Sequence, residues 1–207
     1  DYETLRSHMH ISFVAYDGYF EKEPQGGMVN LVIDHDDGGF QAGAYLRSLG
    51  HRRALCIADN LICMDKERIE GFRRAFAPGE TLFWQIPATR QQRTEFYERR
   101  FQELAEQQIT AVFAVSDYYA LDFMTFFQEK GLGVPQDIQI VGFDDTLASR
   151  NSHPALTTIH QDPGLRAKTA IDCLEALKQG RPCPGRITLP VELMIRESTR
   201  SVSCPIL

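Results

Sequence analysis

Short runs of β-branched and other apolar residues alternate with amphipathic stretches of helical period along most of this chain. The expected strands are 29–33, 53–58, 82–86, 110–115 and 138–143, and the expected helices are 37–49, 65–77, 90–107 and 117–130. Such an order is typical of βαβ units, whose strands form a parallel sheet covered by helices. The sequence therefore predicts an α/β layer sandwich with these five strands in one parallel sheet.

The last third of the chain departs from this alternation. It holds an expected strand at 156–160, a helix at 163–179, and two short strands at 186–189 and 191–195. Pro190 separates the last two strands because proline cannot donate a ladder hydrogen bond. A chain that closes in this way after a complete repeat is expected to cross back into a neighbouring domain.

Polar residues follow several of the expected strands. Asp17 ends the strand expected at 11–16, Ser116 and Asp117 follow the fourth strand of the repeat, and Asp144 and Asp145 follow the fifth. In open parallel sheets, ligands bind outside the carboxyl ends of the strands. We therefore expect these residues to include the binding groups.

Composition excludes several classes of function. The chain has 22 Lys and Arg against 28 Asp and Glu, a net charge of −6, which repels phosphate backbones and anionic membrane surfaces. No apolar run reaches the ~18–20 residues of a membrane span, and the first residues lack the layout of an export signal. The five cysteines are irregularly spaced, without a Cys-x-x-Cys pair, and are expected to be free thiols in a reducing cytoplasm.

Enzyme and metal signatures are missing from the sequence. There is no Gly-x-Ser-x-Gly elbow, no His-Glu-x-x-His pair and no glycine loop that would cradle phosphate. The segment 34–37 carries three Asp and one His, but alternate residues of an extended segment point to opposite faces, and Asp37 is expected to cap the following helix. We therefore expect neither metal nor cofactor, and binding rather than catalysis.

Six short strings occur in a fixed order from about residue 11 to residue 199. They are Asp36-Asp37-x5-Gly43-x2-Leu46-x3-Gly50-His51-Arg52, Arg68-Ile69-Glu70-Gly71-Phe72, Ala114-Val115-Ser116-Asp117-x2-Ala120, Val141-Gly142-Phe143-Asp144-Asp145, Leu156-Thr157-Thr158-Ile159-x-Gln161-Asp162 and Leu189-Pro190-Val191-Glu192-Leu193. Together these strings resemble the lactose-repressor/galactose-repressor (LacI/GalR) family of transcriptional regulators.

The resemblance implies a periplasmic-binding-protein-like fold of two α/β subdomains joined by three crossovers, with an effector in the cleft. It assigns a complete C-terminal subdomain to 36–162 and 191–207, and a partial N-terminal subdomain to 1–35 and 163–190. The first βα units of the N-terminal subdomain, and the helix-turn-helix head that precedes them in the family, are expected to lie outside this chain. We therefore expect a regulator truncated at its N-terminus.

Two residues match the ligand-binding positions of the family most directly. Arg68 taken alone is equally consistent with a surface arginine lying over an apolar helix face. The resemblance instead implies a pocket arginine whose fork binds ligand hydroxyls or a carboxylate. It also implies that Asp144 accepts hydrogen bonds from the effector, and we assign Asp145 to the cap of the next short helix.

Five further residues are weaker candidates. Ser116 stands where many members carry Asn, and Asp117 could contact the ligand or cap its helix. Phe143 could stack on a ligand or belong to the core. Asp17 could face the cleft or form the turn before the next residue. Trp84 could stack on a ring, although its place in an expected strand favours the core.

The sequence thus indicates the effector-binding and dimerisation core of a cytoplasmic bacterial repressor. The expected effector is a sugar, sugar acid or sugar phosphate, with a purine as the alternative if Phe143 or Trp84 stacks on it. Operator DNA would be bound only through the head outside this chain, the chain would form a homodimer, and no membrane partner is expected. A periplasmic solute-binding protein is the alternative function, and a sugar-processing enzyme is a third class.

Overall fold

The computed structural model of this chain describes residues 12–18, 27–61 and 63–200. The chain divides into two compact units, one made of 1–34 and 161–191 and the other of 35–160 and 192–207. The first residue of the strand expected at 11–16 lies outside the described residues, as does Cys204. Within the described part, no helix combines the length and apolar character needed to cross a membrane.

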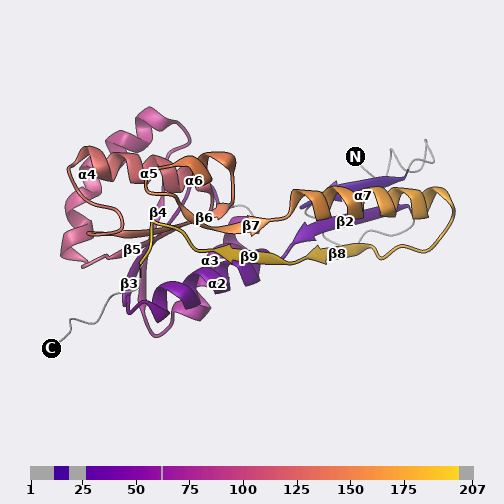
Figure 1. Cartoon of the computed structure of the whole chain (residues 1–207), viewed down its shortest axis with the longest axis horizontal. Coiled ribbons are helices and arrows are strands. Elements are labelled where there is room, and N and C mark those ends of the chain that lie inside the picture. Colours follow the sequence, from indigo (N-terminus) through magenta and orange to yellow (C-terminus); the bar gives the residue numbers. More distant parts are fainter. Residues whose placement is uncertain (1–11, 19–26, 62, 201–207) are drawn as a thin grey trace. The chain divides into compact units, whose positions relative to one another are not determined.

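The first unit is a three-stranded parallel sheet with one helix against it (Figure 1). Its elements are β1 (Phe13–Tyr16), β2 (Met28–Ile33), α7 (Pro163–Lys178) and β8 (Arg186–Leu189). The strand order is β1-β2-β8, and α7 packs on β1 and β2. Helix α7 begins where the Asp162 carboxylate accepts a 2.9 Å hydrogen bond from the Leu165 amide, with Pro163 in the first turn.

The second unit holds a six-stranded sheet in the order β4-β3-β5-β6-β7-β9. The neighbouring pairs β4-β3, β3-β5, β5-β6 and β6-β7 are all parallel. The strands are β3 (Arg53–Ala58), β4 (Glu80–Gln85), β5 (Ala111–Ala114), β6 (Gln139–Asp144), β7 (Thr157–Gln161) and β9 (Val191–Met194). The helices are α2 (His35–Ser48), α3 (Cys63–Phe76), α4 (Arg90–Glu106), α5 (Asp117–Glu129) and α6 (Leu147–Asn151).

Sheet membership corrects one expectation. The strand pattern placed the run 29–33 in the same sheet as the four following strands, whereas the family resemblance assigned it to the N-terminal subdomain. In the structure β2 pairs with β1 and β8, and the larger sheet gains β7 and β9 instead. All six residues of β2 are buried. A strand buried on both faces carries no alternation that would tell which parallel neighbours it joins. The local sequence therefore predicts the strand but not its partners.

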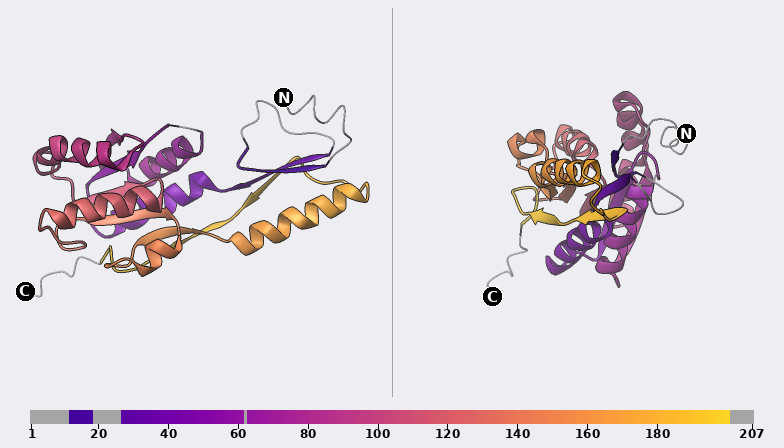
Figure 2. Two further views of the ribbon diagram at one scale, coloured as in Figure 1. Left: turned by 90° about the horizontal axis from the view of Figure 1, so that it is seen from above. Right: turned by 90° about the vertical axis from the view of Figure 1, so that its right-hand side faces the viewer.

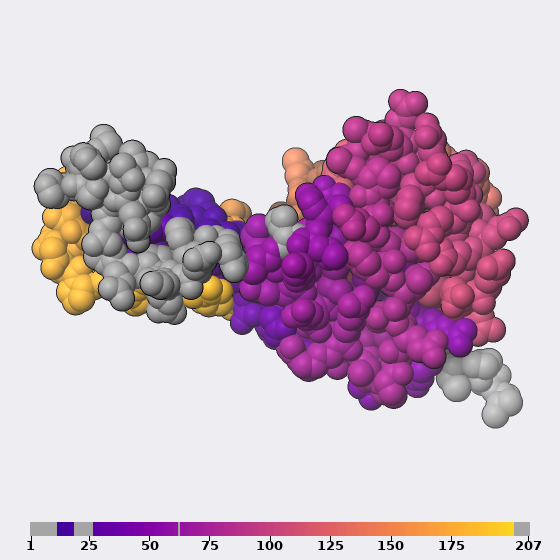
Figure 3. Space-filling view, turned by 180° about the vertical axis from the view of Figure 1, so that it is seen from behind, coloured from indigo at the N-terminus to yellow at the C-terminus, as the bar shows by residue number. Residues whose placement is uncertain are grey.

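Helices cover both faces of the larger sheet, α2 and α3 on one and α4 and α5 on the other (Figures 1 and 2). Consecutive residues of β6 show the two sides. Gly142 lies against Ala120 of α5, whereas the ring of Phe143 lies against Gly38 of α2. Figure 3 shows the opposite side of each unit from Figure 1, with the early part of the larger unit in purple and magenta at its surface.

Glycines allow α2 and α3 to touch along their backbones. A Cβ on Gly39 would lie 1.9 Å from the carbonyl oxygen of Arg68, and one on Gly71 would lie 2.0 Å from that of Asp36. No side chain fits at either position without separating the helices. This close packing fixes α3, and with it Arg68, relative to the start of α2.

Candidate functional site

A polar cluster lies at the carboxyl ends of three adjacent strands of the second unit. Its members come from the start of α2, from α3, and from the segments that follow β3, β5 and β6, which are neighbours in the sheet. We define the polar cluster as His35, Asp59, Asp65, Arg68, Ser116 and Asp144. Its position is the one that open parallel sheets use to bind ligands.

Arg68 is the centre of this cluster and is 8% exposed. Its Nε donates to Nδ1 of His35 at 3.1 Å, and its Nη1 donates to the carbonyl oxygen of Val115 at 2.5 Å. The guanidinium lies 3.8 Å above the ring of Phe143, and Nη1 is 3.8 Å from Oδ1 of Asp144. Because arginine only donates, Nδ1 of His35 is the acceptor and the ring proton is on Nε2. The hydrogen bonds to His35 and Val115 and the ring of Phe143 thus hold the guanidinium in one orientation.

Asp144 presents a carboxylate beside this fork. The Ser116 hydroxyl donates to its Oδ2 at 2.8 Å and also accepts a 3.3 Å hydrogen bond from the Tyr118 amide at the start of α5. Burial raises the pKa of Asp144, although Arg68 and Ser116 oppose the shift. Asp144 and the next residue both have positive φ, 124° and 56°. Consecutive non-glycine residues in this region are strained, as is typical of functional sites.

Three members of the cluster, His35, Asp59 and Asp65, were not identified from the sequence as site residues. Asp65 is 8% exposed, and burial raises its pKa to about 6 against the opposing charge of Arg68, with Asp59 and Asp144 adding to the rise. His35 is 3% exposed and holds the arginine fork. Asp65 lies one helical turn before Arg68, so the i, i+3 spacing could have indicated it. No local signal places His35 there, because its contact depends on the packing of α2 on α3.

Asp117 serves the interior of the fold. Its side chain is fully buried, and its carboxylate accepts hydrogen bonds from the Thr146 amide at 2.8 Å and from the Thr158 hydroxyl at 2.5 Å. Burial raises its pKa against these hydrogen bonds. The residue expected to bind ligand or cap α5 therefore joins α5 to β7 and α6, and Ser116 supplies the cap.

Asp145 does not cap α6, contrary to expectation. The cap is Thr146, whose hydroxyl accepts from the Ser149 amide at 3.2 Å, because Thr146 has the extended backbone of an N-cap while Asp145 is left-handed. The Asp145 carboxylate instead pairs with Arg150 at 2.8 Å and Arg196 at 2.5 Å. Burial raises its pKa, but these hydrogen bonds outweigh burial and hold the pKa below its usual range.

Asp37 also differs from its expected role. Helix α2 begins at His35, so Asp37 lies inside the first turn, where its carboxylate accepts a 2.7 Å hydrogen bond from Nε2 of Gln41. Acidic residues in the first turn of a helix interact favourably with its dipole. Among the described residues, no group of three or more His, Cys, Asp or Glu is arranged to hold a metal ion.

The two candidate aromatic rings lie in the core. Phe143 is fully buried beneath Arg68, and Trp84 is fully buried among Phe96, Tyr97 and Phe123. Neither ring presents a face that a ligand could stack on in this structure. The physical reason is that both belong to strands covered by helices, where apolar burial is the dominant stabilising effect.

Asp17 belongs to the first unit, where it follows β1. Its backbone is left-handed, with φ 46°, and its carboxylate pairs with Arg166 and accepts a 3.3 Å hydrogen bond from the Ile33 amide. The Arg166 guanidinium also lies 4.6 Å from the Tyr16 ring centre. The carboxylate thus lies at the carboxyl end of the smaller sheet, held by α7 and β2.

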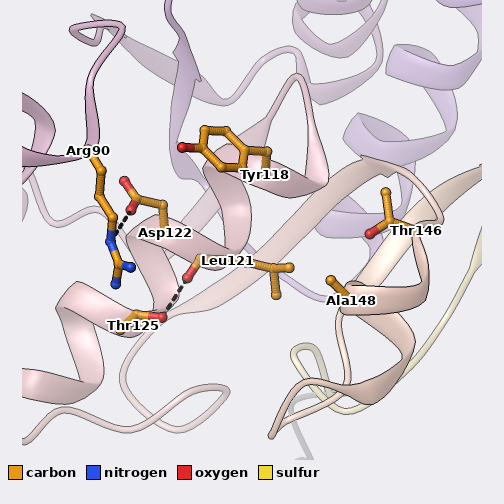
Figure 4. A pocket seen from close by; sticks show the side chains of 7 residues that line it. All are labelled: Arg90, Tyr118, Leu121, Asp122, Thr125, Thr146 and Ala148. Atoms are coloured by element: carbon orange, nitrogen blue, oxygen red, sulfur yellow. Dashed lines mark hydrogen bonds and ion pairs between the residues drawn. The ribbon is translucent and has the colours of Figure 1, made fainter.

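A separate hollow of about 360 Å³ lies between α5 and α6, with Arg90 of α4 at its rim (Figure 4). Figure 4 shows Arg90 directed to Asp122. The Arg90 Nε lies 3.3 Å from the Asp122 Oδ1. Large apolar side chains are exposed on the same helices, with Tyr118 57% and Leu147 74% accessible. Its lining residues are Arg90, Tyr118, Leu121, Asp122, Thr125, Thr146 and Ala148.

Comparison with known proteins agrees with this architecture. Residues 44–199 match the family described as periplasmic binding protein-like domain. The HTH-type transcriptional repressor PurR of Glaesserella parasuis serovar 5 is 35% identical over 193 residues, which cover 87% of this chain and 56% of that repressor. The chain spans about half the length of the curated relatives it matches.

Solved structures give the same result. A LacI family transcriptional regulator from Enterococcus faecium with bound ribose superposes with a TM-score of 0.81 at 25% identity, covering 98% of this chain and 77% of the regulator. A dimeric Lac repressor with an 11-residue C-terminal deletion superposes with a TM-score of 0.78 at 27% identity, covering 90% of this chain and 68% of that repressor. These relatives are transcriptional regulators, not enzymes. The chain therefore belongs to the LacI family of transcriptional regulators, and it carries part of their periplasmic-binding-protein-like effector-binding domain.

Proposed function

We propose that the polar cluster binds the effector of this regulator and that the effector is a sugar or a sugar derivative. The observation that carries the proposal is the arrangement of Arg68, Ser116 and Asp144 at the carboxyl ends of adjacent strands. A fixed forked donor lies beside a carboxylate acceptor and a hydroxyl. Each ligand hydroxyl can donate to one and accept from another, which suits a polyhydroxylated molecule.

The chemistry of the cluster favours a sugar over a flat base. Asp65 supplies a second carboxylate near Asp144 and Arg68, so the cluster has more acceptors than donors. A nucleobase gains much of its affinity by stacking on an aromatic face. The two rings that could stack, Phe143 and Trp84, are buried in the core. The bound ribose of the Enterococcus faecium relative adds support from a similar fold.

We propose that the effector acts on DNA indirectly. Binding would favour one arrangement of the two subdomains and so change the spacing of DNA-binding heads that lie outside this chain. The shift in population cannot exceed the effector's differential affinity for the two arrangements. Its place of action would be the cytoplasm. The alternative, a periplasmic solute-binding protein, predicts an export signal in the coding sequence upstream of Asp1, whereas a repressor predicts a helix-turn-helix there.

We further propose that the regulator is a homodimer joined through the α5/α6 face. Exposed Tyr118 and Leu147 flank the hollow between these helices, and burying large apolar side chains is the main favourable contribution to association. The similar Lac repressor with an 11-residue C-terminal deletion is dimeric. Sedimentation of the full-length regulator tests this, with Leu147→Asp expected to give monomers and Leu165→Asp on α7 as the matched control. Unchanged dimers in the first variant would contradict the assignment.

Calorimetric titration of the full-length regulator tests the effector assignment. The panel is D-ribose, cellobiose, gluconate, ribose 5-phosphate and adenine. We expect a sugar or sugar derivative to bind, and Asp144→Asn and Ser116→Ala each to weaken it by about 1–3 kcal/mol because buried polar groups lose partners. Glu80→Gln, on the exposed edge of β4, is the control. Adenine as the sole binder, or wild-type affinity in both variants, would overturn the proposal.

A further inference from the structure

A second polar cavity lies at the amino ends of the strands of the larger sheet, opposite the polar cluster. It has a volume of about 340 Å³ and is lined by His51, Thr110, Pro135, Gln136, Asp137, Gln139 and Arg200. His51 lies two residues before β3, Thr110 directly precedes β5, and Gln139 is the first residue of β6. These strands are parallel neighbours, so their amino ends lie side by side at one end of the sheet. The polar cluster described above lies at their carboxyl ends, so the two sites are separate.

His51 gives this cavity a buried polar wall. His51 is only 8% exposed, and its Nδ1 is 2.8 Å from the Thr110 hydroxyl. Its Nε2 is buried and has no hydrogen-bond partner of ordinary geometry among the described residues, although the Gln139 side chain lies close to the ring. An unpaired buried nitrogen is destabilising, so such atoms in native proteins generally pair with water or with a ligand.

The remaining polar walls are held in place by hydrogen bonds. Oε1 of Gln139 accepts from the Arg200 amide at 3.0 Å, and the Gln139 amide donates to the Thr110 carbonyl at 3.0 Å. The Asp137 carboxylate accepts from the Gly133 amide at 2.6 Å, which closes the turn before β6. The cavity is therefore a built site rather than a gap between loose side chains.

The charges around the cavity are balanced. Arg200 supplies a cation and Asp137 an anion, both at the exposed rim. Burial lowers the pKa of His51, against a smaller opposing effect of Gln139, so the ring adds no charge near neutral pH. Helices α2 and α5 end near this edge, and the negative ends of their dipoles disfavour a ligand that is purely anionic. A simple cation would in turn be repelled by Arg200.

We propose that this cavity is a second ligand site, distinct from the effector site, which takes a small zwitterion of the amino-acid type. The carboxylate of the ligand pairs with the Arg200 guanidinium and its ammonium group with the Asp137 carboxylate. A polar side chain of the ligand then reaches the buried Nε2 of His51. A free amino acid with an amide or hydroxyl side chain matches these three groups.

Titration of the whole chain by calorimetry and NMR tests this proposal. The probes are L-glutamine, L-asparagine and L-serine, with acetate and ethylamine as single-charge controls. We expect saturable binding of at least one amino acid and a shift of the His51 ring-proton resonance, with neither control binding comparably. Arg200→Gln should weaken binding about tenfold or more and Arg200→Lys less, because lysine keeps the charge but not the fork.

Two comparisons separate this site from the effector site. Asp144→Asn should leave amino-acid binding unchanged, and saturating D-ribose should not displace the amino acid. Arg200 is exposed, so Arg200→Gln should keep the wild-type melting curve, which makes a loss of binding interpretable. No saturable binding by any amino acid, equal binding of acetate, or wild-type affinity of Arg200→Gln would each overturn the proposal.

Discussion

Replacing Arg68 with methionine should destabilise the second unit strongly, because this side chain holds the fold together as well as facing the polar cluster. Its guanidinium makes two hydrogen bonds from a charged donor, to His35 and to the carbonyl of Val115. Each such bond contributes about 1.5–3 kcal/mol, which gives about 3–6 kcal/mol for the two. Methionine keeps the packing over Phe143 and removes the desolvation cost of the buried charge, so we expect a net loss of about 3 kcal/mol.

Urea denaturation followed by the fluorescence of Trp84 measures this loss. Trp84 is the single tryptophan of the chain and is fully buried in the same unit, so its emission reports the unfolding of that unit. A loss of about 3 kcal/mol corresponds to a decrease in melting temperature of about 6–12 °C for a chain of this size.

The matched control is the same substitution six residues later on the same helix. Arg74 pairs with Asp36 at 2.5 Å, but both side chains are exposed, at 56% and 44%. Exposed pairs contribute little to stability, so Arg74→Met should unfold much as the wild type does. Equal stability of Arg68→Met and Arg74→Met would refute the structural role assigned to Arg68.

Three further predictions concern other parts of the chain. The pKa of Asp65 is raised from 3.8 to about 6 in the folded state. As pH falls, the folded state therefore binds a proton at higher pH than the unfolded state does, and the stability of the unit should rise between about pH 6 and pH 4. Asp65→Asn should remove this slope and add up to about 3 kcal/mol above pH 6, and a wild-type slope in urea melts of the variant would contradict the assignment. Gly39→Ala should cost about 1–3 kcal/mol or more because its Cβ would meet backbone 1.9 Å away, while Gly164→Ala, whose nearest contact is a side chain at 3.2 Å, should cost less; equal melting curves would contradict the close packing of α2 on α3. In gel shifts at ~0.15 M salt, this chain alone should not bind operator DNA, given its net charge of −6, and a sequence-specific shift would show that it carries its own DNA-binding surface.

Most elements were predictable because their signals are local. The helix expected at 90–107 is found at Arg90–Glu106, and the strand expected at 186–189 is found at Arg186–Leu189. Other ends moved by one or two residues, as with α3, which begins two residues earlier than expected. Hydrophobic period locates an element, whereas its ends depend on which side chains cap it. The caps of α5 and α6 are Ser116 and Thr146, not the aspartates beside them.

The candidate site was predictable only in part. The family strings pointed to Arg68 and Asp144, and the position after a strand pointed to Ser116; the structure brings the three together, and their binding of a ligand stays a prediction. Asp65 and His35 were missed because their roles arise from contacts between α2, α3 and the strand ends. Asp117 was misassigned because an aspartate after a strand has the same local sequence whether it faces a ligand or the donors of α6 and β7.

The sequence by itself determined the α/β class, the order of the elements and the family, because each depends on residue patterns that are close together in the chain. Strand pattern alone placed 29–33 in the larger sheet and left Phe143 and Trp84 open between core and ligand; tertiary structure shows that β2 pairs with β1 and β8, as the family resemblance implied, and that both rings are buried. It also decided that His51 and Arg200 share a cavity although they lie far apart in the sequence. The physical reason is that strand pairing, burial of a ring and convergence of polar groups all depend on packing between segments far apart in the chain. The local hydrophobic pattern of one segment does not specify which distant segments it packs against.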